Sequence, residues 1–134
     1  MATIRKEIPV KASAADAWDA IRDIGALHTR LVPGFVVATR LEPGARVVTF
    51  GNGLVIREPI ITIDDEAMRL VWSAEGGQTT HFNASAQVLR GADGSTRVVW
   101  TADFLPDSIR DVIDGMMTAG SNVIKQTLDK LGSR

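Results

Sequence analysis

The sequence contains no cysteine and no tyrosine among its 134 residues. Without cysteine the chain has no disulfide, no thiolate nucleophile and no thiolate metal ligand. Histidine is nearly as scarce, because His28 and His81 are the two present and they lie far apart in the chain. A metal centre needs several ligands at close spacing, so we expect neither a metal site nor a bound cofactor.

Strong net charge and long apolar runs are also missing. The formal net charge is −1 at pH 7, which argues against binding to nucleic acid or to anionic membrane surfaces. No segment approaches the roughly 18 consecutive apolar residues that a membrane-spanning helix needs. The opening residues MATIRKEIPV lack the apolar core of a secretion signal, so we expect a cytoplasmic protein.

The composition that remains is that of a folded domain. Hydrophobic residues make up 45% of the chain and charged residues 23%, which are ordinary values for a globular protein. A chain of this length can bury a respectable core. We therefore expect one domain over residues 1–134.

Seven segments have the residue pattern of β-strands. They are residues 2–10, 35–42, 45–51, 54–64, 68–75, 81–90 and 96–104. Short turns rich in glycine, proline or acidic residues separate the last six, and such connections favour an antiparallel meander. Two short helices are expected between the first and second strands. The first begins at a capping box formed by Ser13 and Asp16, and Pro33-Gly34 ends the second.

A long amphipathic helix is expected from Asp107 to Leu131. Its apolar positions recur every three or four residues; they are Ile109, Val112, Ile113, Met116, Met117, Gly120, Val123, Ile124, Leu128 and Leu131. A sheet with one apolar face can bury that face together with this stripe by curving around the helix. We therefore predict an α+β helix-grip fold, in which a seven-stranded curved antiparallel sheet wraps around the C-terminal helix.

Three segments resemble one known superfamily. They are ADAWDAIRDIGALHTRLVPG, RVVTFGNGLVIREPIITIDDEAMRLVWS, and GSTRVVWTADFLP with the helix that follows it. Together they cover most of the chain and are similar to the START/Bet v 1-like (SRPBCC) superfamily, nearest to its polyketide cyclase/dehydrase-like branch. The resemblance implies the helix-grip fold. Members include lipid carriers, hormone receptors and aromatic polyketide cyclases, and the fold does not choose among these functions.

A ligand cavity is predicted between the sheet and the long helix. The strand faces that should meet the helix carry small residues, and these would leave space for a mostly apolar ligand. They are Ala74, Ala84, Ala86 and Ala102. The expected ligand-binding residues are Trp72, Trp100, Phe82, Phe104, Ile113, Met116, Met117, Arg57 and His28. The aromatic and methionine side chains among them would also suit an ordinary core.

Arg57 and Glu58 are neighbours in a strand that is apolar on both faces. Side chains alternate along a strand, so one of the two should point inward. Pairing Ile63 with Met68 would put Arg57 on the face of Trp72, and a slip of one residue would put Glu58 there. An inward arginine could bind a carboxylate or enolate oxygen, and an inward glutamate could act as a base with a raised pKa. A cross-strand salt bridge near the cavity mouth is the third alternative.

His28 lies in the second short helix, which borders the cavity mouth in the superfamily that the chain resembles. Histidine transfers protons near neutral pH. If the protein is an enzyme, the candidate catalytic residues are therefore Arg57, Glu58 and His28.

The leading functional prediction is the binding or carriage of a small hydrophobic or aromatic molecule, lipid-like or polyketide-like, in this cavity. The first alternative is a polyketide cyclase/dehydrase of the aromatase type that needs no cofactor. The second is a module whose groove takes an apolar segment of a partner protein. An exposed strand edge would also allow a homodimer.

Overall fold

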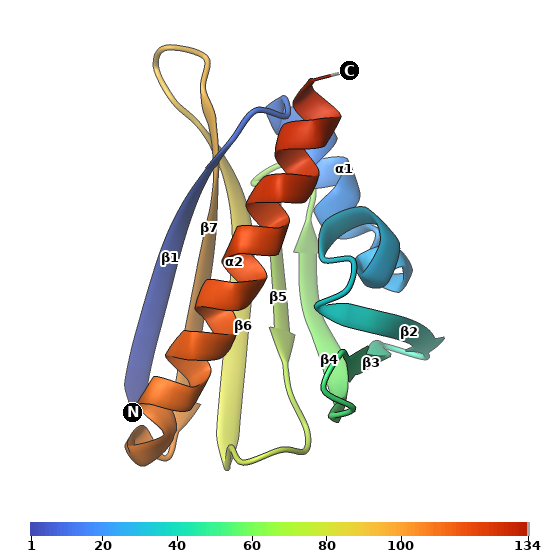
Figure 1. The fold of residues 1–134 in the computed structure, drawn as a ribbon, viewed down its shortest axis with the longest axis vertical. Coiled ribbons are helices and arrows are strands. Elements are labelled where there is room, and N and C mark those ends of the chain that lie inside the picture. Colours follow the sequence, from blue (N-terminus) through green and yellow to red (C-terminus); the bar gives the residue numbers. More distant parts are fainter. Residues whose placement is uncertain (134) are drawn as a thin grey trace.

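The backbone of residues 1–133 forms one seven-stranded antiparallel sheet and two α-helices (Figure 1). The computed structural model describes residues 1–133. The strands are β1 (Ala2–Val10), β2 (Val36–Glu42), β3 (Ala45–Phe50), β4 (Val55–Asp64), β5 (Arg69–Ser73), β6 (His81–Arg90) and β7 (Thr96–Leu105). The strand order β1-β7-β6-β5-β4-β3-β2 confirms the predicted meander, with β1 added beside β7.

The helices occupy the positions that the sequence predicts. Helix α1 (Ala14–Arg22) begins where the backbone N–H of Asp16 donates a hydrogen bond to the side chain of Ser13, at 3.1 Å. The second short helix is a 3₁₀ turn, η1 (Ile24–Ala26), followed by a π-helical turn, η2 (Leu27–Leu31). Helix α2 (Arg110–Gly132) follows a 3₁₀ turn, η3 (Asp107–Ile109). The long helix is therefore confirmed, with its first residues in the tighter turn.

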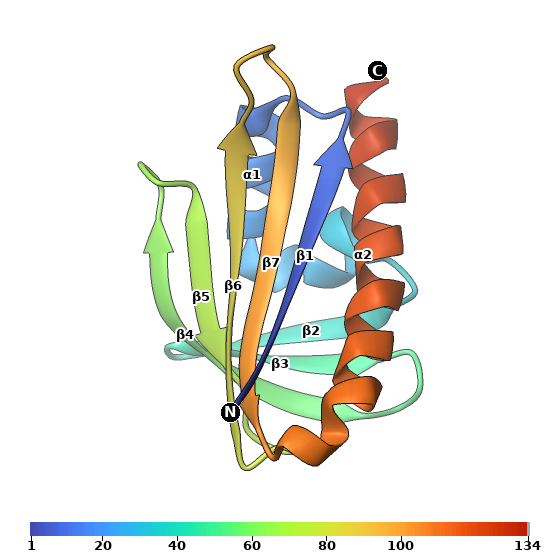
Figure 2. The same ribbon diagram turned by 90° about the vertical axis from the view of Figure 1, so that its left-hand side faces the viewer.

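The sheet is strongly bent around α2, as the helix-grip prediction requires. Helix α2 runs diagonally across the concave face of the sheet (Figure 1). In the turned view, β2 and β3 run across the direction of β1 and β7 (Figure 2). The sheet therefore covers α2 along one side and then bends beneath it, while α1 and the short turns cover the rest of the concave face.

The strand pairing confirms which side chains share the concave face. Ala84 of β6 lies opposite Trp72 of β5 and opposite Ala102 of β7, so the three side chains point the same way. Helix α2 packs onto this face through buried side chains, which are Met117, Ile124 and Leu128. This packing forms the main hydrophobic core, and it lies under the middle and the C-terminal half of α2.

Gly120 allows α2 to come unusually close to the sheet. A Cβ atom at this position would lie 2.9 Å from Cζ3 of Trp100 and 3.2 Å from Cε2 of Phe35. Such contacts are too short for ordinary packing, so any larger residue would push the two rings away. The glycine therefore allows Trp100 and Phe35 to pack directly against the helix.

Two glycine substitutions in α2 test this close approach. Gly115 faces solvent, and a Cβ there would meet no atom within 4 Å. We expect Gly115→Ala to raise the free energy of unfolding by about 0.8–1 kcal/mol, because alanine favours the helix. Gly120→Ala should lower it, because overpacking against Trp100 costs about 1–3 kcal/mol and outweighs the same helical gain. Urea unfolding followed by circular dichroism measures both. If both substitutions changed the free energy of unfolding equally, the close contact of Gly120 with the two rings would be contradicted.

Candidate ligand-binding cavity

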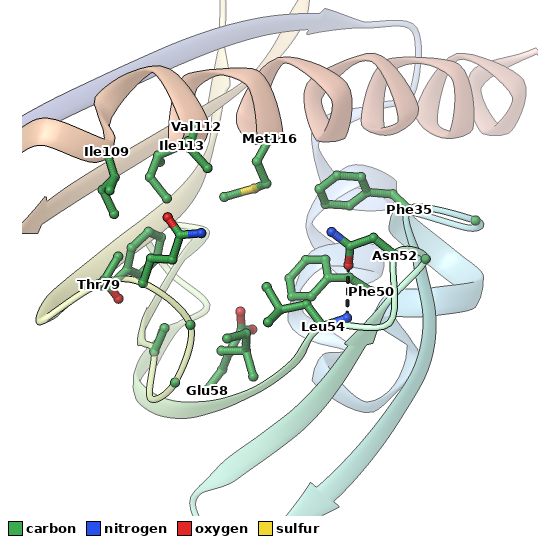
Figure 3. Close-up of a pocket in the computed structure, with 18 residues that line it drawn as sticks. Phe35, Phe50, Asn52, Leu54, Glu58, Thr79, Ile109, Val112, Ile113 and Met116 are labelled. Atoms are coloured by element: carbon green, nitrogen blue, oxygen red, sulfur yellow. Dashed lines mark hydrogen bonds between the residues drawn. The ribbon is translucent and has the colours of Figure 1, made fainter.

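A β-bulge in β4 decides which of the two neighbouring charges points inward. Residues Thr62 to Asp64 pair regularly with β5, but the next pair joins Ile60 to Trp72 and leaves Ile61 without a partner. Without this extra residue, Arg57 would share the face of Trp72. With it, Glu58 takes that face, and its carboxyl group points into the space beneath α2 (Figure 3). The structure thus settles a question that the sequence leaves open.

Glu58 and Arg46 form a buried ion pair. They lie directly opposite each other on β4 and β3. Nε of Arg46 donates a hydrogen bond to Oε1 of Glu58 at 2.8 Å, and the two residues are only 3% and 7% exposed. The guanidinium carbon of Arg46 also lies 5.4 Å from the centre of the Trp72 ring, a cation–π distance. Removal from water raises the pKa of Glu58, and the charge and hydrogen bond of Arg46 oppose this rise.

Arg57 points to the opposite, outer side of the sheet, so the prediction that it contacts a ligand in the cavity is corrected. Its side chain is 41% exposed. Nε donates to Glu42 at 2.9 Å, and Nη1 donates to Glu75 at 3.1 Å. Arg57 therefore has the exposed salt-bridge role, and the inward charge is Glu58 with a different arginine as its partner.

An outer cavity of about 420 Å³ lies between the start of α2 and the bent part of the sheet (Figure 3). This volume exceeds the ~300 Å³ at which ligand pockets begin. The walls are mostly apolar. The main contributors are Ile109, Val112, Ile113 and Met116 around the start of α2, Phe35 and Phe50 at one end, and Leu54, Ile56, Ala74, Thr79 and Phe82 along the sheet and its loops. Leu54 and Val112 remain 45% and 58% exposed at the mouth.

A smaller inner cavity of about 70 Å³ lies deeper, towards α1. The lining residues that carry polar atoms are Arg46, Glu58, Trp72 and Trp100, and the rest of its wall is apolar. Five residues line both cavities and so form the partition between them. They are Phe35, Phe50, Glu58, Phe82 and Met116. Glu58 therefore lies in the wall shared by the two cavities, while its partner Arg46 lines the inner one.

Gly51 in the β3–β4 turn positions Phe35 and Phe50, two of the residues that line both cavities. The N–H of Gly51 donates to the carbonyl oxygen of Phe35 at 2.9 Å. A Cβ atom on Gly51 would lie 2.7 Å from the carbonyl oxygen of Gly34, so no other residue fits there. This contact joins the turn after η2 to the β3–β4 turn. It brings the rings of Phe35 and Phe50 edge to face, with centres 5.5 Å apart.

Five of the nine predicted ligand-binding residues line one or both of the cavities. Ile113, Met116 and Phe82 line the outer cavity, and Trp72, Trp100, Phe82 and Met116 line the inner one. Phe104 and Met117 line neither, because both are fully buried in the core. His28 also lines neither, and its Nδ1 lies 3.1 Å from Oγ1 of Thr39 on β2. Those three expected contacts are corrected.

The predicted role of the alanines is only partly correct. Ala74 lines the outer cavity and Ala86 lines the inner one. Ala84 and Ala102 are covered by the packed core and are 2% and 0% exposed. Small residues therefore leave space only where α2 does not fill the concave face.

Two features are absent from residues 1–133. No group of three or more histidine, aspartate or glutamate side chains is arranged to hold a metal ion. No helix in this part of the chain is both long enough and apolar enough to cross a membrane.

The strand order and the long C-terminal helix define a helix-grip fold. The family model described as "Polyketide cyclase / dehydrase and lipid transport" matches residues 1–134. The chain belongs to this family, which confirms the resemblance seen in the sequence. No curated protein matches the chain.

Solved structures share the fold at low sequence identity. The protein XoxI from Bacillus cereus is 19% identical, with a TM-score of 0.86 over 98% of each chain. A START superfamily protein from Mycobacterium smegmatis is 11% identical, with a TM-score of 0.78 over 96% of this chain and 98% of the other. The di-domain ARO/CYC protein BexL is 13% identical, with a TM-score of 0.83 over 96% of this chain and 47% of BexL. At these identities the likeness shows the fold alone.

The raised pKa of Glu58 predicts how stability depends on pH. Burial raises this pKa above its ordinary value of 4.5, so the folded protein binds the proton more tightly than the unfolded chain does. The contribution of Glu58 to stability is therefore fully present below about pH 4.5 and is lost as pH rises through the folded pKa. Since glutamine does not ionise, Glu58→Gln should gain stability relative to the wild type between about pH 4 and pH 7. Urea unfolding followed by tryptophan fluorescence across this range measures the difference.

Glu42→Gln provides a control of opposite sign. Hydrogen bonds from Arg57 and Arg40 lower the pKa of Glu42. The contribution of Glu42 is therefore present above the ordinary pKa and is lost as pH falls through the folded value. Relative to the wild type, Glu42→Gln should lose stability as pH rises. If the stability difference from the wild type changed with pH in the same direction for both variants, the assignment of Glu58 as the buried acid would be contradicted.

Proposed function

We propose that the protein binds a small hydrophobic or aromatic molecule in the outer cavity and releases it again, as a carrier would. The observation that carries this proposal is the apolar cavity of about 420 Å³, with exposed apolar residues at its mouth and the buried carboxyl group of Glu58 in its wall. Apolar walls with a few fixed polar groups are typical of small-molecule sites. Membership of a family described by cyclases and lipid transport supports the same class of ligand.

The mouth of the cavity suits the entry and exit of a ligand. Gly76 and Gly77 in the β5–β6 loop line the cavity and have φ angles of 110° and 71°. Glycine is the residue that adopts such angles readily. Across the mouth lies the β3–β4 turn, whose Asn52 side chain accepts a hydrogen bond from the N–H of Leu54 at 3.0 Å. We propose that these two loops move apart to admit the ligand.

Native mass spectrometry of the purified protein tests binding directly, together with solvent extraction of any bound compound. A fluorescence titration with prodan, a neutral naphthyl ketone dye, provides a defined probe. We expect its emission to shift to the blue on binding and the affinity to fall at least about tenfold in Ile113→Trp, because the larger ring fills the cavity. Ile61→Trp is the matched control, since Ile61 is exposed at the bulge and lines neither cavity.

A protein that carries no bound compound and does not bind prodan would contradict this function. Equal affinities in the wild type and in Ile113→Trp would instead show that the dye binds elsewhere on the surface.

A second function, acid–base catalysis on a ketone, is favoured by one observation. Glu58 is a buried carboxyl group with a raised pKa on the cavity wall, next to the cationic Arg46. A carboxylate of raised pKa is a stronger base. It would take a proton from the carbon beside a carbonyl group, and the electron pair of the broken C–H bond would move to the carbonyl oxygen. Arg46, rather than the Arg57 expected from the sequence, would stabilise the resulting enolate.

Hydrogen–deuterium exchange tests this second function. In D₂O the methyl protons of bound 2-acetylnaphthalene should exchange faster than in solvent alone, because Glu58 returns a deuteron to the carbon. Proton NMR measures the loss of the methyl signal. Glu58→Gln should abolish the acceleration while leaving binding within about tenfold, since catalysis and binding use different parts of the wall. If the ketone bound without faster exchange, catalysis would be excluded and ligand carriage would remain the proposed function.

A further inference from the structure

Trp100 lines the inner cavity and carries an unused hydrogen-bond donor. The residue is 8% exposed, and its Nε1 is buried without a partner. In contrast, Nε1 of Trp18 donates to Oδ1 of Asp65 at 2.9 Å. An indole N–H can only donate, and a buried donor without an acceptor is unfavourable. The inner cavity therefore favours a ligand group that carries a hydrogen-bond acceptor.

Arg46 adds further donors to the same space. A guanidinium group carries five N–H bonds, and only the one on Nε is used, in the hydrogen bond to Glu58. Neither terminal nitrogen donates to any residue between 1 and 133. Arg46 is only 3% exposed, so its terminal nitrogens have little contact with solvent.

The inner cavity is too small to hold a whole ligand. Its volume of about 70 Å³ corresponds to roughly two water molecules at ~30 Å³ each. It can therefore hold a group of only a few atoms, while the apolar body of the ligand stays in the outer cavity. Phe35, Phe50, Glu58, Phe82 and Met116 line both spaces. A ligand that reached past them from the outer cavity would place its polar end inward.

The ion pair limits the charge that this polar end can carry. Arg46 and Glu58 together have no net charge, although Arg46 still offers donors. A ligand carboxylate would leave one negative charge uncompensated in apolar surroundings, which is strongly unfavourable. An uncharged carbonyl or hydroxyl oxygen would accept the same hydrogen bonds without adding charge.

We infer that the protein selects ligands with an uncharged oxygen at one end, held in the inner cavity by Trp100 and Arg46, and that Glu58 excludes carboxylates of the same shape. This inference rests on the proposed binding of a ligand in the outer cavity. It assigns Trp100 and Glu58 as residues that determine specificity.

Three probes of closely similar shape test the inference by equilibrium dialysis at neutral pH. They are 2-acetylnaphthalene, 2-isopropylnaphthalene and 2-naphthoate, which differ in the group that would enter the inner cavity. Hydration of the free probes affects each dissociation constant. The informative quantity is therefore how a ratio of two constants changes between the wild type and a variant.

The first variant, Trp100→Phe, removes the indole donor. The dissociation constant of the ketone should rise about five- to tenfold relative to that of the hydrocarbon, which is the usual effect of losing one buried hydrogen bond. Trp18→Phe is the control, because Trp18 donates to Asp65 and lines neither cavity. The control should leave the ratio within about twofold of the wild type.

The second variant, Glu58→Gln, removes the negative charge but keeps an acceptor for Arg46. The dissociation constant of naphthoate should fall at least about tenfold relative to that of the ketone, because Arg46 then compensates the charge of the ligand. Glu42→Gln on the outer side of the sheet is the control. If the probes bind and the ratio in either test variant stays within about twofold of wild type, the inference fails while the proposed function stands. If no probe binds the wild type, both fail.

Discussion

The buried ion pair between Arg46 and Glu58 is the constraint on which the rest of the cavity depends. Removing two charges from water is costly, and their mutual attraction often only balances that cost. An apolar pair of the same size would frequently be as stable or more stable, by about 1–4 kcal/mol. The pair is therefore poorly explained as a source of stability. Its position beside the two cavities is better explained by its effect on a bound molecule.

Holding this pair in place requires cooperation between three local features. The β3–β4 pairing sets Arg46 opposite Glu58, and the bulge at Ile61 turns Glu58 towards the concave face. Gly51 lets the turn of the same hairpin touch the backbone of Gly34, which positions the aromatic partition beside the pair. A change at any one of them would alter the cavity without changing the order of the strands. The fold and the site are therefore specified by different residues.

Periodicity made the fold predictable from the sequence, whereas the orientation of single side chains depended on details that periodicity does not report. Alternating strands and a long apolar stripe survive an error of one residue, but the choice between Arg57 and Glu58 does not. The bulge that decides it involves Ile61, an ordinary strand residue. Arg46 was within reach of the sequence, because a hairpin turning at Asn52 pairs it with Glu58 by symmetry.

The apolar stripe of α2 has two roles that the sequence pattern cannot separate. Met117, Ile124 and Leu128 are buried in the core, while Ile109, Ile113 and Met116 line the outer cavity. The two sets have the same hydrophobic character, although Ile109 lies in η3 just before α2. The bend of the sheet distinguishes them (Figure 2). Where the sheet stays close to α2, apolar side chains fill the space and stabilise the fold. Where β2 to β4 bend beneath the start of α2, similar side chains leave a cavity. The stability supplied by the packed half of α2 is what allows the other half to face an open cavity and a buried charge pair.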